Sequence, residues 1–217
     1  DTLVEQEIGL FGSWIGAQAE ASLIPKLMTG LRNSRIRVVP TQALAERWLS
    51  PFPAEEFTDD PEMKYMRPEQ IKSWVNAKNT YMSNPNFSKE RAEKLIQIRQ
   101  KLILACQKNG VELLLGSDAP QIFNVPGFSI HHEMKYMVDA GLTPYETLRT
   151  GTVNVASYLN KTDSGTIKTG NVSDLVLLSG NPLKDINQTR NIEGVMIGTN
   201  WLSKAYIEKE LKKLEKK

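Results

Sequence analysis

Apolar residues recur at helical spacing along most of the first half of the chain. Three stretches predict helices on this basis: residues 23–31 within a helical or looped segment 1–34, residues 68–83, and residues 88–108. Ser88 offers an N-cap to the third helix, and Asn109 with Gly110 predicts its end. In the second half, residues 132–140, the segment from Thr143 and residues 152–160 predict three further helices.

Two short apolar runs break this helical pattern. Residues 35–40 contain Ile36, Val38 and Val39, which are β-branched, and end in proline, and residues 111–115 are apolar apart from Glu112, as expected of buried parallel strands. The helix between them makes a strand-helix-strand unit, which we expect to be parallel and right-handed. After Gly165 the pattern changes again, and residues 172–178 and 194–197 predict strands of a small β module.

The second apolar run ends in Gly116, Ser117 and Asp118, and this makes Asp118 the candidate catalytic residue. A carboxylate just past a buried parallel strand lies at the rim where barrel enzymes hold their reactive groups. The alternative is that Asp118 only accepts hydrogen bonds from its own turn.

Two other places could contribute to a site at this rim. Thr41 and Gln42 follow the strand at 35–40 and are candidate substrate-binding residues, the alternative being a helix cap and a solvated amide. Residues 50–68 are broken by prolines and predict a long loop on the same face. Its apolar residues suit either a lid over the site or simple packing against its neighbours.

Composition limits the class of protein. The 217 residues are 40% hydrophobic and 24% charged, as in an ordinary globular protein, and the formal net charge of +2 gives no reason to expect nucleic acid. In the lysine-rich residues 204–217, glutamates are interleaved, which is typical of a solvated helix or tail. A single cysteine excludes an internal disulfide, and no run is long enough to span a membrane.

The C-terminal half carries a series of motifs in a particular order. Gly-Ser-Asp at 116–118 is followed by Phe-Ser-Ile-His-His-Glu-Met at 128–134, Ala-Gly-Leu-Thr-Pro at 140–144 and Gly-Asn-Pro-Leu-Lys-Asp-Ile at 180–186. This series resembles the closing section of the amidohydrolase superfamily, in particular imidazolonepropionase-like enzymes and metal-dependent Xaa-Pro dipeptidases. The resemblance covers roughly residues 108–200.

The resemblance implies an α/β fold that is the C-terminal part of a (β/α)8 TIM barrel followed by part of a small β-sandwich. Residues 1–160 would hold the last two barrel strands with their helices, with 35–40 as the seventh strand and 116–118 as the end of the eighth. Residues 161–203 would be the C-terminal share of the sandwich, and 204–217 a charged helix or tail.

The resemblance also implies a metal-dependent amidohydrolase that acts on amide bonds other than ordinary peptide bonds. Asp118 would contact a divalent metal, with one or two zinc ions expected as in family members, and act as general base on a metal-bound water. The family's other ligands are mainly histidines on earlier strands, and these strands are absent from the 217 residues. We therefore expect the chain to be an inactive fragment of a longer enzyme, without metal of its own.

The chain has only two histidines, His131 and His132, and they are adjacent. Neighbouring residues of a helix point about 100° apart, so this pair is poorly placed to chelate one metal ion. His131 is the candidate for binding a substrate carboxylate. The alternative is a helix-start histidine with a structural hydrogen bond only.

The expected partners are a small amide or dipeptide substrate, with no nucleic acid and no membrane segment. Because two strands leave both sheet edges open, we also expect self-association or pairing with the missing N-terminal part. A non-catalytic scaffold module and a deaminase relative remain alternative functions. The compartment, cytoplasmic or exported, stays open.

Overall fold

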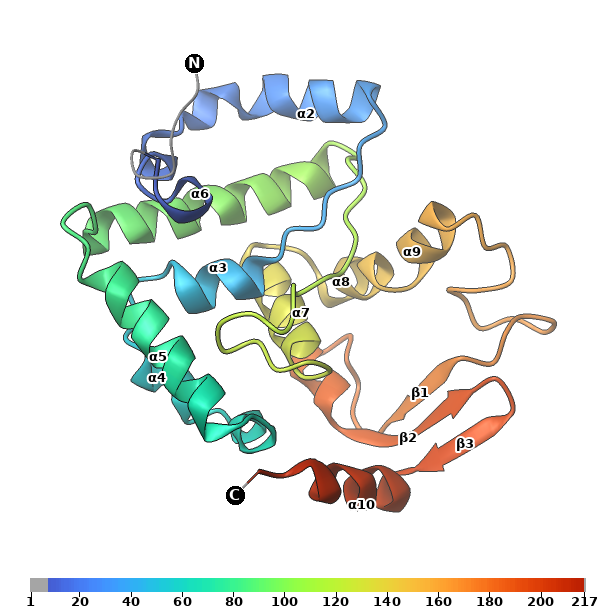
Figure 1. Ribbon diagram of the computed structural model, residues 1–217. Coiled ribbons are helices and arrows are strands. Elements are labelled where there is room, and N and C mark those ends of the chain that lie inside the picture. The colour runs from blue at the N-terminus through green and yellow to red at the C-terminus, as the bar shows by residue number, and fades with distance from the viewer. Residues whose placement is uncertain (1–7, 217) are drawn as a thin grey trace.

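The computed structural model describes residues 8–216, and within this range the chain is mainly helical, with one small sheet (Figure 1). The α-helices are α2 (Ile24–Asn33), α3 (Gln42–Trp48), α4 (Glu55–Thr58), α5 (Pro68–Met82), α6 (Lys89–Lys108), α7 (Ser129–Asp139), α8 (Pro144–Thr150), α9 (Val153–Tyr158) and α10 (Lys204–Leu214). Short 3-10 helices are η1 (Leu10–Gly12), η2 (Gly16–Gln18), η3 (Ala21–Leu23), η4 (Pro61–Tyr65) and η5 (Ile186–Arg190). The strands are β1 (Leu175–Leu178), β2 (Ile192–Ile197) and β3 (Asn200–Ser203).

The helix starts at Ser88 and Thr143 agree with the sequence because they depend on local capping, whereas α3 was not predicted. The side chain of Ser88 accepts a hydrogen bond from the backbone of Arg91, as expected of an N-cap. At the start of α8, Thr143 and Glu146 form both halves of a capping box. Helix α7 begins three residues earlier than predicted, at Ser129, so both histidines lie in its first turn.

The two predicted barrel strands are reduced to one parallel bridge between Val38 and Leu113. The backbone of Val38 donates to Glu112 and accepts from Leu114, at 3.0 and 2.9 Å, so the parallel direction is confirmed but the ladder is not. The next amide, of Leu115, instead donates to Thr150 at the end of α8. A strand needs hydrogen-bonding partners along its length. In the described part of the chain, these two segments pair only with each other, and they do so at a single bridge.

The bridge lies against a core shared by α2, α6 and α7. Figure 1 shows α2 running alongside α6, and their buried side chains include Met28 and Cys106. Val111 and Leu113 pack into the same cluster, which confirms the apolar run as buried and Cys106 as a core residue. This core holds the segment that leads to Asp118.

Residues 50–68 fold into α4 and η4 instead of an open loop. Phe57 and Met63 are buried, and they pack in one cluster with Trp74 of α5 and Phe123. The rings of Phe57 and Phe123 lie 5.5 Å apart. Phe57 and Met63 therefore pack against their neighbours, which is the alternative to a lid. Phe52, in the same segment, is exposed.

The C-terminal module is a three-stranded antiparallel sheet in the order β1-β2-β3, with α10 beneath it in Figure 1. The predicted strands at 172–178 and 194–197 are confirmed with shifted bounds, and β3 was not predicted. Val176, Leu177, Ile197 and Trp201 are exposed on the sheet. Between residues 8 and 216, no helix is both long and apolar enough to cross a membrane.

Candidate functional site

Asp118 lies at the end of the apolar segment, where the sequence places it. Its carboxylate is exposed, and its backbone adopts a left-handed conformation with a φ of 55°. The turn that carries it is held from both sides: the hydroxyls of Ser117 and Ser129 lie 2.7 Å apart, and Asn124 donates to the carbonyl of Ser117 at 3.1 Å. The turn is thus tied directly to the first turn of α7, which carries the two histidines.

Thr41 and Gln42 lie where the segment 35–40 passes into α3. Thr41 is the N-cap residue, also in a left-handed conformation, with a φ of 46°. Gln42 is fully buried, so the solvated-amide alternative is wrong. Its amide nitrogen donates to Glu46 and its oxygen accepts from Arg99, both at 3.0 Å.

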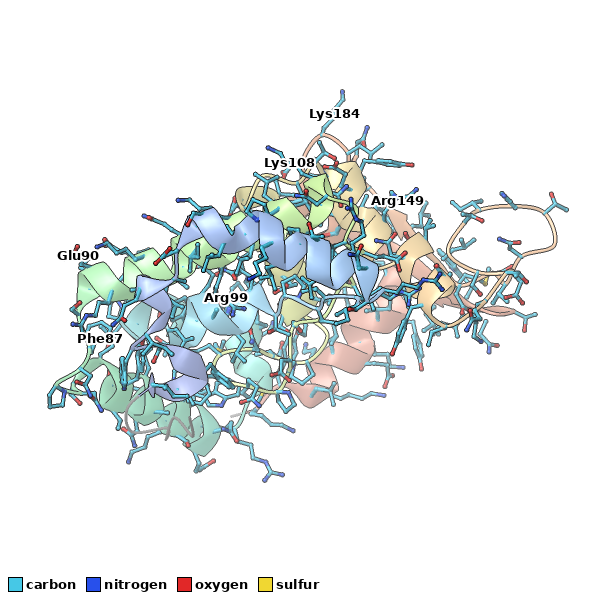
Figure 2. All side chains as sticks on the ribbon, turned by 90° about the horizontal axis from the view of Figure 1, so that it is seen from above. Phe87, Glu90, Arg99, Lys108, Arg149 and Lys184 are labelled. Carbon is cyan, nitrogen blue, oxygen red and sulfur yellow. The ribbon has the colours of Figure 1, made fainter. Side chains whose placement is uncertain are left out.

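Arg99 fixes this end of the segment from α6. Figure 2 shows it midway along that helix, over α3, and besides Gln42 it binds the carbonyl of Pro40 at 2.6 Å. Burial lowers the pKa of Arg99, against the opposing charges of Glu133 and Glu46, without changing its cationic state near neutral pH.

Glu133 is a buried carboxyl that sequence reasoning did not single out. It accepts a 2.6 Å hydrogen bond from the backbone of Ala43 at the start of α3. Burial raises its pKa to about 7, and the backbone hydrogen bonds of Ala43 and Gln42 offset only part of this rise. Among residues 8–216 its second oxygen finds no hydrogen-bond partner.

His131 contacts the C-terminal module. Its Nδ1 lies 2.9 Å from the hydroxyl of Thr189 in η5, and that hydroxyl donates its only hydrogen to the carbonyl of Ile186. His131 must therefore donate from Nδ1, which leaves Nε2 as an acceptor when the ring is neutral. Burial, with the charge of Arg190, lowers the pKa of His131 to about 4, so the ring is neutral at physiological pH.

His132 is the centre of a network of charged groups. Its Nε2 lies 2.5 Å from Glu62 and 3.9 Å from Asp60, both in the segment 50–68. Arg190 lies 3.1 Å from both ring nitrogens. Arg47, which is buried, binds Asp60 at 2.6 Å from the other side.

The pKa values follow from these contacts. Burial tends to raise the pKa of Glu62, but the hydrogen bond with His132 and the charge of Arg190 outweigh it and hold the pKa at about 2. Burial and the charges of Arg47 and Arg190 lower the pKa of His132. If the Nε2–H of His132 donates to Glu62, the guanidinium of Arg190 can donate only to Nδ1, and its 3.1 Å approach to Nε2 is a contact without a hydrogen bond.

Asp60, Glu62 and His132 form a candidate metal-binding group, with one ligand atom of each within 4.8 Å of the others. Two carboxylates and an imidazole are ligands that suit a divalent metal. As arranged, however, the Nε2 of His132 carries the proton that it donates to Glu62, Arg47 pairs with Asp60 at 2.6 Å, and Arg190 lies 3.9 Å from Glu62. The types of side chain in this group suit a metal ion. Their present hydrogen bonds and ion pairs are those of a charged network without one.

Sequence reasoning missed this group because its members are far apart in the chain and follow no motif spacing. The only local signal is the acidic run Asp59-Asp60-Pro61-Glu62 within the predicted loop 50–68. Nothing in the sequence indicates that this run lies beside His132 or Arg190 in the folded chain.

Comparison with known proteins defines the class. The sequence profile of the amidohydrolase family matches residues 58–202, more than half of the chain. The protein therefore belongs to the amidohydrolase family, a family of generally metal-dependent hydrolases. None of the curated proteins matches the chain.

Solved structures share the fold of this chain. A Xaa-Pro dipeptidase with bound methionine in its active site is 20% identical over 87% of this chain, with a TM-score of 0.55, and a bottromycin amidohydrolase is 21% identical over 80%, with a TM-score of 0.62. The chain spans 38% of the length of each. These likenesses support a TIM-barrel type of hydrolase fold, of which the described residues form a helical and β-sheet part.

Proposed function

We propose that this chain is the C-terminal part of a metal-dependent enzyme that hydrolyses amide bonds in small molecules such as dipeptides or cyclic amides. The observation that carries the proposal is the match to the amidohydrolase family over residues 58–202. The names of the two solved relatives, a dipeptidase and an amidohydrolase, support this substrate class.

In this proposal Asp118 is the catalytic residue and a metal ligand. It accepts a proton from the attacking water and passes it to the leaving amine, as a carboxylate near a neutral operating pH can. Its exposed position at the end of a buried apolar segment supports this role. A divalent metal, for which we propose zinc as one or two ions, activates water and polarises the scissile carbonyl when bound.

We assign substrate binding to Thr41, Gln42 and His131. The parallel bridge between Val38 and Leu113 supports this, because it sets the segment before Thr41 beside the segment that leads to Asp118. His131 lines a cavity at the start of α7, where its Nε2 is an acceptor and therefore suits a substrate N–H rather than the carboxylate expected from the sequence. To bind a substrate, the side-chain amide of Gln42 must first give up its hydrogen bond to Glu46 or the one from Arg99.

We also propose that the 217 residues alone are inactive, and that they self-associate or pair with the rest of the enzyme. The inactivity of the chain alone is supported by its length, since it spans only 38% of each of the two solved structures. The exposed apolar side chains of the sheet support self-association or pairing, because an uncovered apolar face favours association. Sizing of the isolated chain should show species larger than 24.4 kDa.

The test is an assay of the full-length protein beside the 217-residue chain. Both are given a panel of Xaa-Pro and other dipeptides, with zinc, with a chelator, and with zinc restored after chelation. The proposal predicts hydrolysis of at least one member by the full-length protein only, lost with the chelator and restored by zinc. A full-length protein that is folded, zinc-treated and inactive on the panel would favour the scaffold alternative.

A further inference from the structure

A cavity of about 600 Å³ lies where η4, the start of α7, the end of η5 and α10 meet. These four segments come from distant parts of the sequence, and α10 closes one side. The C-terminus of the described chain is tied to η4, since the backbone of Lys216 donates to the carbonyl of Lys64 at 2.7 Å. A cavity of this size suits a small organic molecule.

The walls of the cavity are largely apolar. The rings of Tyr65 and Phe128 are stacked at 5.0 Å with an angle of 16° between their planes. On the facing helix, Ile207 and Leu211 line the cavity and stand four residues apart, on one face of α10. Such walls accommodate an aromatic ring or a branched aliphatic chain.

The basic groups that line the cavity are Lys64, Lys204 and Arg190. The first two are already paired, Lys64 with Glu215 at 2.8 Å and Lys204 with Glu193 at 2.9 Å. Exposed lysine pairs of this kind contribute little to ligand binding because solvent competes with them. Arg190 is therefore the cation that distinguishes the cavity.

The charge of Arg190 is only partly met. Its Nη1 lies 3.9 Å from the carboxylate of Glu62, beyond hydrogen-bond distance, and its Nη2 lies 3.1 Å from the ring nitrogens of His132. Glu62 itself is held at 2.5 Å by His132. A guanidinium group has five N–H donors in a planar fork that matches a carboxylate, so capacity remains for an anion.

We propose that this cavity binds a small apolar carboxylic acid, with its carboxylate on Arg190 and its apolar part between the Tyr65–Phe128 pair and the Ile207–Leu211 face of α10. The ligand must be singly charged and compact, because Glu62 and Glu208 also line the cavity and disfavour further negative charge. His131 lines the same cavity, so this inference rests on the substrate-binding role proposed for that residue, although the binding itself needs neither a metal nor Asp118.

The test compares two probes of the same shape on the unmodified 217-residue chain by titration calorimetry. We expect 3-phenylpropionate to bind about tenfold more tightly than 3-phenylpropionamide, since one charge-assisted contact to Arg190 separates them. Equal affinities, or no binding of either probe up to about 10 mM, would overturn the proposal. Failure here would remove this cavity, and with it His131, from the proposed substrate site, whereas the metal-dependent hydrolysis assigned to Asp118 is tested separately by turnover.

Variants then locate the site. Arg190→Gln should abolish the preference for the acid, whereas Arg149→Gln, an arginine of α8 that points outward in Figure 2 and does not line the cavity, should keep it. Ile207→Ser should weaken both probes several-fold, and Tyr206→Ser on the exposed side of α10 should not. A preference that survives Arg190→Gln in a folded variant contradicts the assignment. If that variant does not fold, the comparison of the two probes on the unmodified chain decides.

Discussion

The side chains of His132 and Glu62 meet at 2.5 Å although 70 residues separate them in the sequence. This contact joins the first turn of α7 to η4, and Arg190 extends it to η5. The segment 50–68, the segment around α7 and the C-terminal module are thus held together by one set of charged groups. Their stability is coupled at this point.

Removing Glu62 should therefore destabilise the chain. Glu62 is 3% exposed, and Glu62→Ala leaves the N–H of His132 without its acceptor and removes the carboxylate that lies 3.9 Å from Arg190. We expect a loss of about 3 kcal/mol in the free energy of unfolding, the range for a broken buried pair. Urea unfolding measures it, and Glu56→Ala, an exposed glutamate of α4, should change stability by less than about 0.5 kcal/mol. Equal effects of the two variants would mean that the network contributes no stability.

Arg47 should not tolerate lysine. Its guanidinium binds the carbonyl of Phe123 at 2.8 Å through one nitrogen and Asp60 at 2.6 Å through another, and it lies over the ring of Phe57. A lysine has no planar fork to make both bonds from this buried position. We expect Arg47→Lys to lower the free energy of unfolding by about 2 kcal/mol in chemical denaturation. The same change at the exposed Arg67 is the control, and a matching small effect at both sites would contradict the account.

Lys78 gives the stability a pH dependence of known sign. It is fully buried on α5, where its ammonium nitrogen lies 3.0 Å from the carbonyl of Trp48 and 2.8 Å from that of Ser50. Burial lowers the pKa of Lys78 to about 7, and the charge of Glu46 opposes this shift only in part. The unfolded chain has a lysine pKa near 10.4 and so binds more protons between these two values.

Stability should therefore rise with pH from about 7 toward 10, by at most about 1.4 kcal/mol per pH unit from this group, and be independent of it below pH 7. Lys78→Met should flatten this part of the profile, even if the variant is less stable overall. Lys72→Met, on the exposed side of the same helix, should keep the original slope. Urea midpoints at pH 7, 8 and 9 measure it, and parallel slopes for Lys78→Met and the unmodified chain would exclude Lys78 as the source.

What the sequence predicted well depends on neighbours along the chain. The capping box of Thr143 and Glu146 and the cap at Ser88 are formed as expected, because each involves residues three positions apart. The position of Asp118 after a buried segment also follows from a local apolar run. The family resemblance drawn from the motifs at 116–186 is confirmed by the match over residues 58–202.

What the sequence did not predict depends on contacts across the chain. The network of Asp60, Glu62, His132 and Arg190 joins residues that follow no periodicity, so nothing local distinguished them from solvated charges. The barrel strands were expected at full length, but hydrogen-bond ladders require neighbouring strands, and the amide of Leu115 donates to α8 instead. The roles of Thr41, Gln42 and His131 toward a substrate stay predictions.

The most direct test of the central claim is the divalent-metal content and turnover of the full-length protein, unmodified and with Asp118→Asn. Asp139→Asn, which changes an exposed aspartate paired with Lys135 on α7, is the matched control. The account predicts about one or two ions per unmodified chain and a loss of turnover of about a thousandfold in Asp118→Asn only. If Asp118→Asn turns over as fast as Asp139→Asn, Asp118 is not the general base, and the proposed mechanism is wrong.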